Sequence, residues 1–107
     1  MHKTLGPGLL EHVYSSCLKV ELQDQGLELS SEVLLPVIYK DHLIDLGYRL
    51  DLLVASEIIV ELKAAEQLAA VHKAQLLTYL KLTHKRLGLL INFNVPLIKD
   101  GILRLIL

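Results

Sequence analysis

Cysteine and bulky aromatic residues are scarce in this chain, which has one cysteine, one phenylalanine and no tryptophan among 107 residues. The lone thiol, Cys17, excludes an internal disulfide and a zinc site built from cysteines, and we expect it to be a small core residue. The remaining aromatic residues are four tyrosines, so no platform for stacking nucleic-acid bases is evident.

Strong net charge and long apolar segments are also absent. The formal net charge is -1, so attraction to a nucleic acid must come from a local basic patch or a bound cation. No apolar run approaches the roughly 20 residues that a bilayer requires, and the opening MHKTLGPG lacks the apolar segment of a signal peptide. We therefore predict a cytoplasmic protein with no membrane partner.

Apolar residues, by contrast, are abundant. They make up 52% of the chain, and the mean hydropathy is +0.45. A chain of this length forms a single domain, 1–107, around one core. Such a high apolar content in a small chain indicates that some apolar surface contacts another subunit, so we predict a homo-oligomer.

The order of apolar patterns and chain breakers predicts an α/β fold, with a mixed central β-sheet flanked by helices. The expected order is a helix over 6–26, strands over 28–39, 49–54 and 58–63, a helix over 65–84, and strands over 86–95 and 101–107. Pro36 indicates an edge strand or a bulge, and Gly47 indicates a bend. The second helix is expected to connect its neighbouring strands in a right-handed crossover.

Each helix is expected to bury one apolar face. In the first helix this face comprises Leu10, Val13, Tyr14, Cys17, Leu18 and Leu22, and Gly26 ends the helix. In the second helix it comprises Leu68, Val71, Ala74, Leu77 or Thr78, Leu80 and Leu82.

Three ionisable residues, Asp51, Glu61 and Lys63, interrupt two otherwise aliphatic strands. Side chains alternate across a strand, so Glu61 and Lys63 share one face. A three-residue turn over 55–57 places Asp51 directly opposite Glu61, with Cβ atoms roughly 5 Å apart. A two-residue turn would instead send the two carboxylates to opposite faces. The chemistry of this segment therefore depends on the length of its turn.

Two adjacent carboxylates repel unless they share a proton or a cation lies between them. Ligands that are all oxygen favour Mg²⁺ or Mn²⁺ over zinc, and Mg²⁺ usually keeps several waters and a substrate phosphate. Such a site hydrolyses phosphodiesters, with Lys63 orienting the attacking water or stabilising the developing charge. The alternative, from spacing alone, is a hydrated strand face with a salt bridge.

The stretch GPGLLEHVY resembles the signature of the GxxExxY proteins, with Gly8, Glu11 and Tyr14 at the naming positions. The stretches DLLV, IVELKA, HKAQLLTYLKL and GLLINFNV follow in that family's order, so the resemblance covers nearly the whole chain. That family is placed in the PD-(D/E)XK nuclease superfamily. The resemblance implies a restriction-endonuclease-like fold and, where activity is present, metal-dependent hydrolysis of phosphodiesters.

The same resemblance implies roles for individual residues. It makes Asp51, Glu61 and Lys63 the superfamily's D, E and K, and it gives Glu11 the role of completing the metal shell. From the sequence itself, Glu11 is also explained as a solvated residue favoured by the helix dipole. Leu50 stands where the superfamily's name has proline, which changes little because only the carboxylate is a ligand.

A second set of candidate residues belongs to the second helix. Gln75 and Tyr79 match the Q-x-x-x-Y element of the superfamily's exonuclease-like branch, so the resemblance implies a catalytic role for both. Helical spacing puts His72 on the same face, where the three side chains can hydrogen-bond phosphate or brace the carboxylates. We assign His72, Lys73 and Tyr14 to substrate binding; the alternatives are a packing role for His72 and a role for Tyr14 in packing or in bracing Glu11.

Further basic residues follow on the second helix and after it. These are Lys81, His84, Lys85 and Arg86, which can either receive a phosphate backbone or complement the C-terminal helix dipole. Together the patterns predict a Mg²⁺-dependent nuclease acting on DNA, or less favourably on RNA. The second hypothesis is a non-catalytic binding or assembly module that retains the nuclease scaffold and dimerises through its leucine-rich surface.

Overall fold

The computed structural model describes the backbone of residues 1–107 and all side chains except those of Pro36 and residues 45–48. Its elements in chain order are α1 (His2–Leu5), α2 (Glu11–Asp24), β1 (Leu29–Tyr39), β2 (His42–Val54), β3 (Ile58–Lys63), α3 (Ala70–Thr83), β4 (Leu87–Asn92), the 3₁₀ helix η1 (Ile98–Gly101) and β5 (Ile102–Ile106). The predicted fold class, a mixed sheet between helices, is confirmed. The short helices α1 and η1 were not predicted, because four residues are too few to show helical periodicity.

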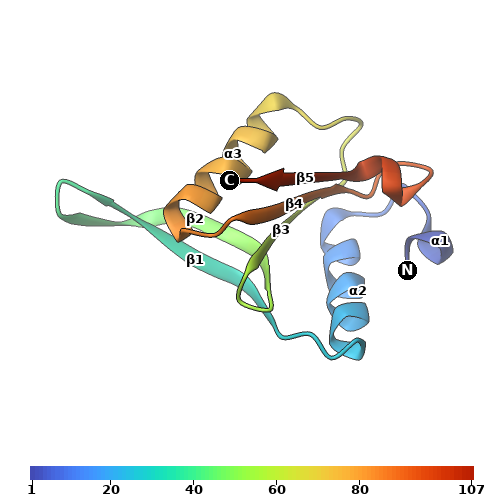
Figure 1. The fold of residues 1–107 in the computed structure, drawn as a ribbon. Helices are drawn as coiled ribbons and strands as arrows, with labels where there is room; N and C mark the ends of the chain where they lie inside the picture. Colours follow the sequence, from blue (N-terminus) through green and yellow to red (C-terminus); the bar gives the residue numbers. More distant parts are fainter.

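The five strands form one sheet in the order β1-β2-β3-β4-β5. All neighbouring pairs are antiparallel except β3 and β4, which are parallel and connected through α3 (Figure 1). β1 is an edge strand, as Pro36 predicted, and its register with β2 shifts between Leu35 and Val37. The bend predicted at Gly47 falls in 45–48, outside the residues whose side chains are described.

The two long helices pack on opposite faces of the sheet (Figure 1). On the α2 face, Tyr14 packs against Leu52, Leu62 and other apolar residues of β2, β3 and β4. On the α3 face, Leu76 and Leu80 pack against Ile59 and other residues of the sheet. Because successive residues of a strand point to opposite faces, Ile59 and Leu62 belong to different clusters.

The predicted helix faces were wrong in part. In α3 the buried residues are Leu76, Tyr79 and Leu80, whereas Val71 is 66% exposed and Leu82 is 42% exposed. Leucines occur on several sides of this helix, so spacing alone did not select the face that packs on the sheet. In the first helix, Leu10 is 68% exposed because it precedes the first helical residue and has an extended backbone.

Tyr14 anchors the segment that precedes α2. Its ring is completely buried and stacks on Phe93, with a centroid separation of 4.5 Å. Its hydroxyl donates to the carbonyl oxygen of Gly6 and accepts from the N–H of Leu9. Tyr14, at the end of the first turn of α2, therefore fixes this turn and the preceding loop relative to the sheet.

The paired strands β1 and β2 extend beyond the rest of the sheet as a two-stranded arm (Figure 1). Large apolar side chains on the described part of this arm are exposed, including Leu34 at 61%, Ile38 at 72% and Leu43 at 62%. Among the described residues, no helix has the length and apolar character needed to cross a membrane.

Candidate active site

The turn between β2 and β3 has the predicted length. Val54 pairs with Ile58, followed by Leu53 with Ile59 and Leu52 with Val60, so residues 55–57 form the turn. This confirms the register from which Asp51 was expected to meet Glu61. Ala55 and Ser56 have φ values of 53 and 57°, a left-handed conformation that costs these residues some strain.

Beyond the Leu52–Val60 pair, the β2–β3 ladder opens and the two carboxylates occupy the gap. The backbone N–H of Asp51 donates to Oε1 of Glu61 over 3.1 Å. The backbone N–H of Leu62 donates to Oδ2 of Asp51 over 2.8 Å. Each carboxylate is therefore held by a backbone donor of the opposite strand, in place of a strand-to-strand hydrogen bond.

The pKa of Glu61 shows how closely these carboxylates interact. Burial, which leaves the residue 6% exposed, and then the charge of Asp51 raise the pKa of Glu61 to about 8. A hydrogen bond to the Asp51 side chain adds to this rise, while the N–H of Asp51 and the charge of Lys63 oppose it. Without a cation, the pair thus favours one shared proton, as expected for two carboxylates in one site.

Glu11, the first residue of α2, lies within electrostatic range of this pair. Partial burial raises the pKa of Glu11; Lys63 opposes that rise, Asp51 adds to it and His72 opposes it. The side chains of four elements therefore interact here: α2, β2, β3 and α3. Glu11 itself is more exposed than Glu61 and lies at the rim of the site.

The end of β3 is fixed by hydrogen bonds to β4. The carbonyl oxygen of Lys63 accepts from the N–H of Phe93 over 2.9 Å. The buried amide of Asn92 makes two bonds to the backbone of Ala65, accepting over 3.1 Å and donating over 2.9 Å. Asn92 was not predicted, because its only signal in the sequence is an Asn at the end of an apolar strand. These bonds hold the backbone from which Lys63 projects.

A cavity of about 320 Å³ opens beside the carboxylates. Glu11, Asp51, Leu62 and Glu32 line one part of it. The rest of the wall comes from α2 and comprises His12, Ser15, Ser16 and Lys19. None of these four residues was predicted, although they form a polar stripe on the helix opposite to its apolar face. Glu32, in β1, was not predicted either.

The other predicted residues occupy different surroundings. Nδ1 of His72 accepts from the N–H of Ala69 over 3.1 Å, so this imidazole caps the start of α3. Gln75 is half-buried, Lys73 is exposed, and Tyr79 is 3% exposed among the apolar residues of the α3 face. With its hydroxyl bound to the backbone of the loop before α2, Tyr14 does not line the cavity.

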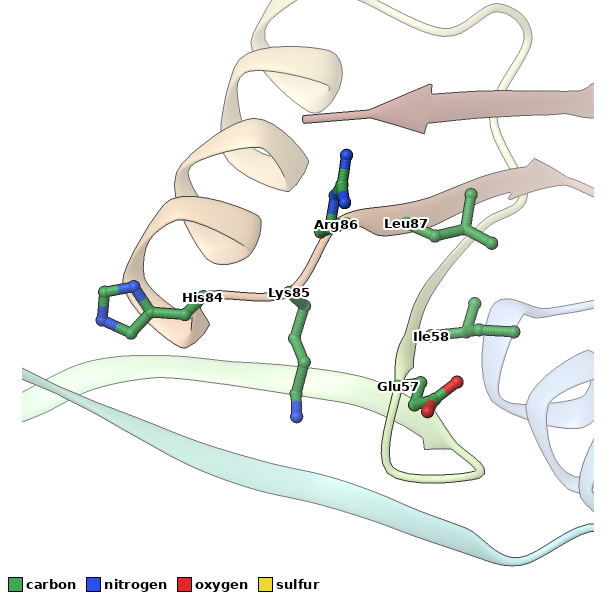
Figure 2. Close-up of a pocket in the computed structure, with 6 residues that line it drawn as sticks. All are labelled: Glu57, Ile58, His84, Lys85, Arg86 and Leu87. Atoms are coloured by element: carbon green, nitrogen blue, oxygen red, sulfur yellow. The ribbon is translucent and has the colours of Figure 1, made fainter.

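A larger cavity of about 480 Å³ lies at the opposite end of β3 (Figure 2). It includes three of the predicted basic residues, His84, Lys85 and Arg86, together with Glu57. Figure 2 shows the side chains of His84 and Arg86 pointing away from Lys85 and from each other. Because these basic side chains do not converge, this cavity is not the candidate active site despite its greater volume.

The donor set fits a hard divalent cation. Asp51 and Glu61 offer oxygen ligands whose mutual repulsion a cation would relieve, and Glu11 adds a third carboxylate at the rim. Within the described part of the chain, no three carboxylate, imidazole or thiol groups are gathered tightly enough to enclose a metal by themselves.

One known protein family matches nearly the whole chain. The family model of the PD-(D/E)XK nuclease superfamily matches residues 1–105. The chain belongs to this superfamily, whose members are generally nucleases and typically use divalent metals. Comparisons with curated proteins and with solved structures gave no match.

Proposed function

We propose that this protein is a Mg²⁺- or Mn²⁺-dependent nuclease that hydrolyses phosphodiester bonds of DNA, with RNA as the less favoured substrate. One observation carries the proposal: the Asp51 and Glu61 carboxylates meet where β2 and β3 separate, each held by a backbone donor of the other strand. A purely structural strand pair has no need to replace ladder hydrogen bonds with buried carboxylates. Membership of the nuclease superfamily supports the same function.

Each residue then has a defined task. Asp51 and Glu61, with Glu11 from the rim, would hold the divalent ion, which when bound supplies charge neutralisation and an acidified water. Lys63, on the strand that carries Glu61, orients the attacking water or stabilises charge on the phosphate. We retain Gln75 and His72 as residues that organise substrate near Glu11. Tyr14 acts through packing, by fixing the start of α2, and Tyr79 on α3 stays a proposed catalytic residue together with Gln75.

The decisive experiment measures cleavage of linear, nicked, circular and single-stranded DNA, and of single-stranded RNA, with Mg²⁺ or Mn²⁺. The key variant is Asp51→Asn, which keeps an acceptor for the N–H of Leu62 but removes the charge. We expect it to lose activity by on the order of 10³-fold while remaining folded. Its matched control is Glu57→Gln at the turn, which removes a carboxylate from the other end of β3. Equal activity of Asp51→Asn and the wild type would overturn the proposal.

Metal titration separates the enzyme from the alternative, a binding or assembly module. We expect millimolar Mg²⁺ to raise the melting temperature of the wild type and to shift the backbone resonances of Asp51 and Leu62. Asp51→Asn should show neither effect. A module without catalytic demand would bind nucleic acid without these responses to metal.

We also propose that two copies associate through the β1–β2 arm. Ile38 and Leu43 are paired and therefore share a face, and both are strongly exposed. Tyr39 and Ile44 are also exposed, but each is the next residue along its strand and so points to the other face of the arm. The proposed contact is therefore carried by Ile38 and Leu43. Light scattering should show a dimer that Ile38→Lys converts to a monomer; a monomeric wild type would contradict this.

The cytoplasmic location stays a prediction.

A further inference from the structure

The wall of α2 that faces the carboxylate cavity carries a set of polar groups with no task so far. His12, Ser15, Ser16 and Lys19 line the cavity together with Asp51. Their spacing of three and four residues places them along one side of the helix. Ser15 and Lys19 are half-buried, whereas His12 and Ser16 are exposed.

These groups are available to a ligand. Among the side chains that the structure describes, those of Ser15, Ser16 and Lys19 take part in no internal hydrogen bond or ion pair. Hydroxyls and an ammonium are the groups with which proteins bind the phosphate backbone of nucleic acids. An apolar or cationic ligand would leave these donors unsatisfied.

The cavity also has two chemically different ends. Glu11 and Asp51 interact electrostatically and make one part of the cavity acidic and suited to a cation, whereas Lys19 lies about two helical turns from Glu11 along the α2 wall; Glu32 also lines the cavity. At 1.5 Å of rise per residue, Ser15 lies about 6 Å and Lys19 about 12 Å beyond Glu11 along the helix. Phosphates of one DNA strand recur about every 3.4 Å along the duplex axis. The wall therefore reaches phosphates beyond the one held at the carboxylates.

We propose that Ser15, Ser16 and Lys19 form a phosphate subsite that binds the backbone of the cleaved strand next to the scissile phosphate. This inference rests on the proposed nuclease function and extends it. The subsite identifies the substrate as a polynucleotide strand, because a ligand with a single phosphodiester cannot occupy both ends of the cavity. The subsite is polar and contacts the backbone, so it adds affinity without base preference.

Lys19→Gln tests the subsite, with Lys40→Gln at the tip of the arm as a control that makes the same charge change. Binding of a fluorescent oligonucleotide is measured with Ca²⁺ at several salt concentrations. We expect Lys19→Gln to weaken binding roughly tenfold at low salt and to lower the salt slope by about 0.7 to 0.9, the contribution of one phosphate contact. Lys40→Gln should match the wild type, and Lys19→Arg should restore most of the affinity.

Kinetics provide a second readout. We compare an oligonucleotide with bis(p-nitrophenyl) phosphate, which has one phosphodiester and no neighbouring phosphate. For Lys19→Gln, and for Ser15→Ala combined with Ser16→Ala, we expect kcat/KM to fall about tenfold more on the oligonucleotide than on the small diester. Equal losses on both substrates, or an unchanged salt slope, would overturn the subsite. If the wild type cleaves neither substrate with Mg²⁺ or Mn²⁺, the proposed function fails first and the subsite with it.

Discussion

The two ends of β3 share neighbouring strands and yet differ in structure. At the turn end, Ile58 and Ile59 pair regularly with β2, and the adjoining cavity is the larger one, with cations that diverge (Figure 2). At the other end, the ladder opens at Asp51, and backbone donors hold carboxylates in a smaller cavity. The candidate site is therefore marked by charged groups that meet at backbone donors released from the ladder, and not by the size of the cavity.

The strongest way to break this difference is to change the turn. Deleting Ser56 shifts the register by one when the hairpin rebuilds a three-residue turn from Val54, Ala55 and Glu57. Leu53 then pairs with Ile58, and the carboxylates of Asp51 and Glu61 point to opposite faces. We expect nuclease activity to fall by on the order of 10³-fold or more. Activity assays and backbone NMR spectra check both parts of this expectation.

The matched control keeps the length of the turn. Ser56→Gly retains three residues and relieves a left-handed backbone while it makes the unfolded chain more flexible. It should therefore leave activity unchanged and keep stability within about 1 kcal/mol of the wild type. Full activity in a deletion variant whose NMR spectra show the shifted register would contradict the importance of the register.

A second test removes the ammonium group of Lys63 from the end of β3 that carries Glu61. Lys63→Met keeps much of the aliphatic stem and removes the ammonium, so the fold should persist while kcat falls roughly 10²- to 10³-fold. Steady-state kinetics with Mg²⁺ measure the loss. An effect confined to KM would instead assign Lys63 to substrate binding.

A third test uses the raised pKa of Glu61. Its ordinary value is 4.5 and its folded value is about 8, so the folded protein binds more protons than the unfolded chain between these limits. Stability without metal should therefore fall as pH rises from about 4.5 to about 8, by on the order of a few kcal/mol. Urea unfolding at several pH values measures this trend.

Glu61→Gln and added Mg²⁺ sharpen the same experiment. The variant has no carboxyl to deprotonate at this position, so its stability should depend much less on pH. Mg²⁺ favours the ionised pair, so it should stabilise the wild type most at the alkaline end and leave the variant unaffected. A wild type with pH-independent stability would contradict the proximity of the two carboxylates.

The smallest effect is expected at the turn end. Lys85→Gln removes an ammonium whose side chain points away from those of His84 and Arg86 (Figure 2). Because the charge is isolated and screened by salt, cleavage rates at moderate salt should change less than about twofold. A large loss would mean that the substrate spans both ends of β3.

Much of the fold was predictable because it follows from local periodicity. The alternation of apolar residues, Pro36 and Gly26 indicated the long helices and the strands, and the resemblance to the nuclease superfamily agreed with that order. The buried face of α3 was not predictable in the same way. A Cβ on Gly88 of β4 would lie 2.9 Å from Cδ1 of Leu76, so a close helix–strand contact selects that face, and helical spacing cannot reveal it.

The candidate site divides in a similar way. Spacing and turn length were enough to bring Asp51 opposite Glu61, because side-chain alternation and antiparallel pairing are local rules. They could not reveal Glu32, Asn92 or the polar wall of α2, since these residues join the site through contacts between elements distant in the chain.

By itself, the sequence determined which residues can lie opposite each other in the β2–β3 hairpin, since a three-residue turn and a two-residue alternation leave one register. Only the tertiary structure decided that the ladder opens at Asp51, that burial raises the pKa of Glu61 to about 8, and that α2 places donors along the same cavity. The reason is physical: pairing register is a local property of the chain, whereas burial and electrostatic proximity depend on elements brought together by folding.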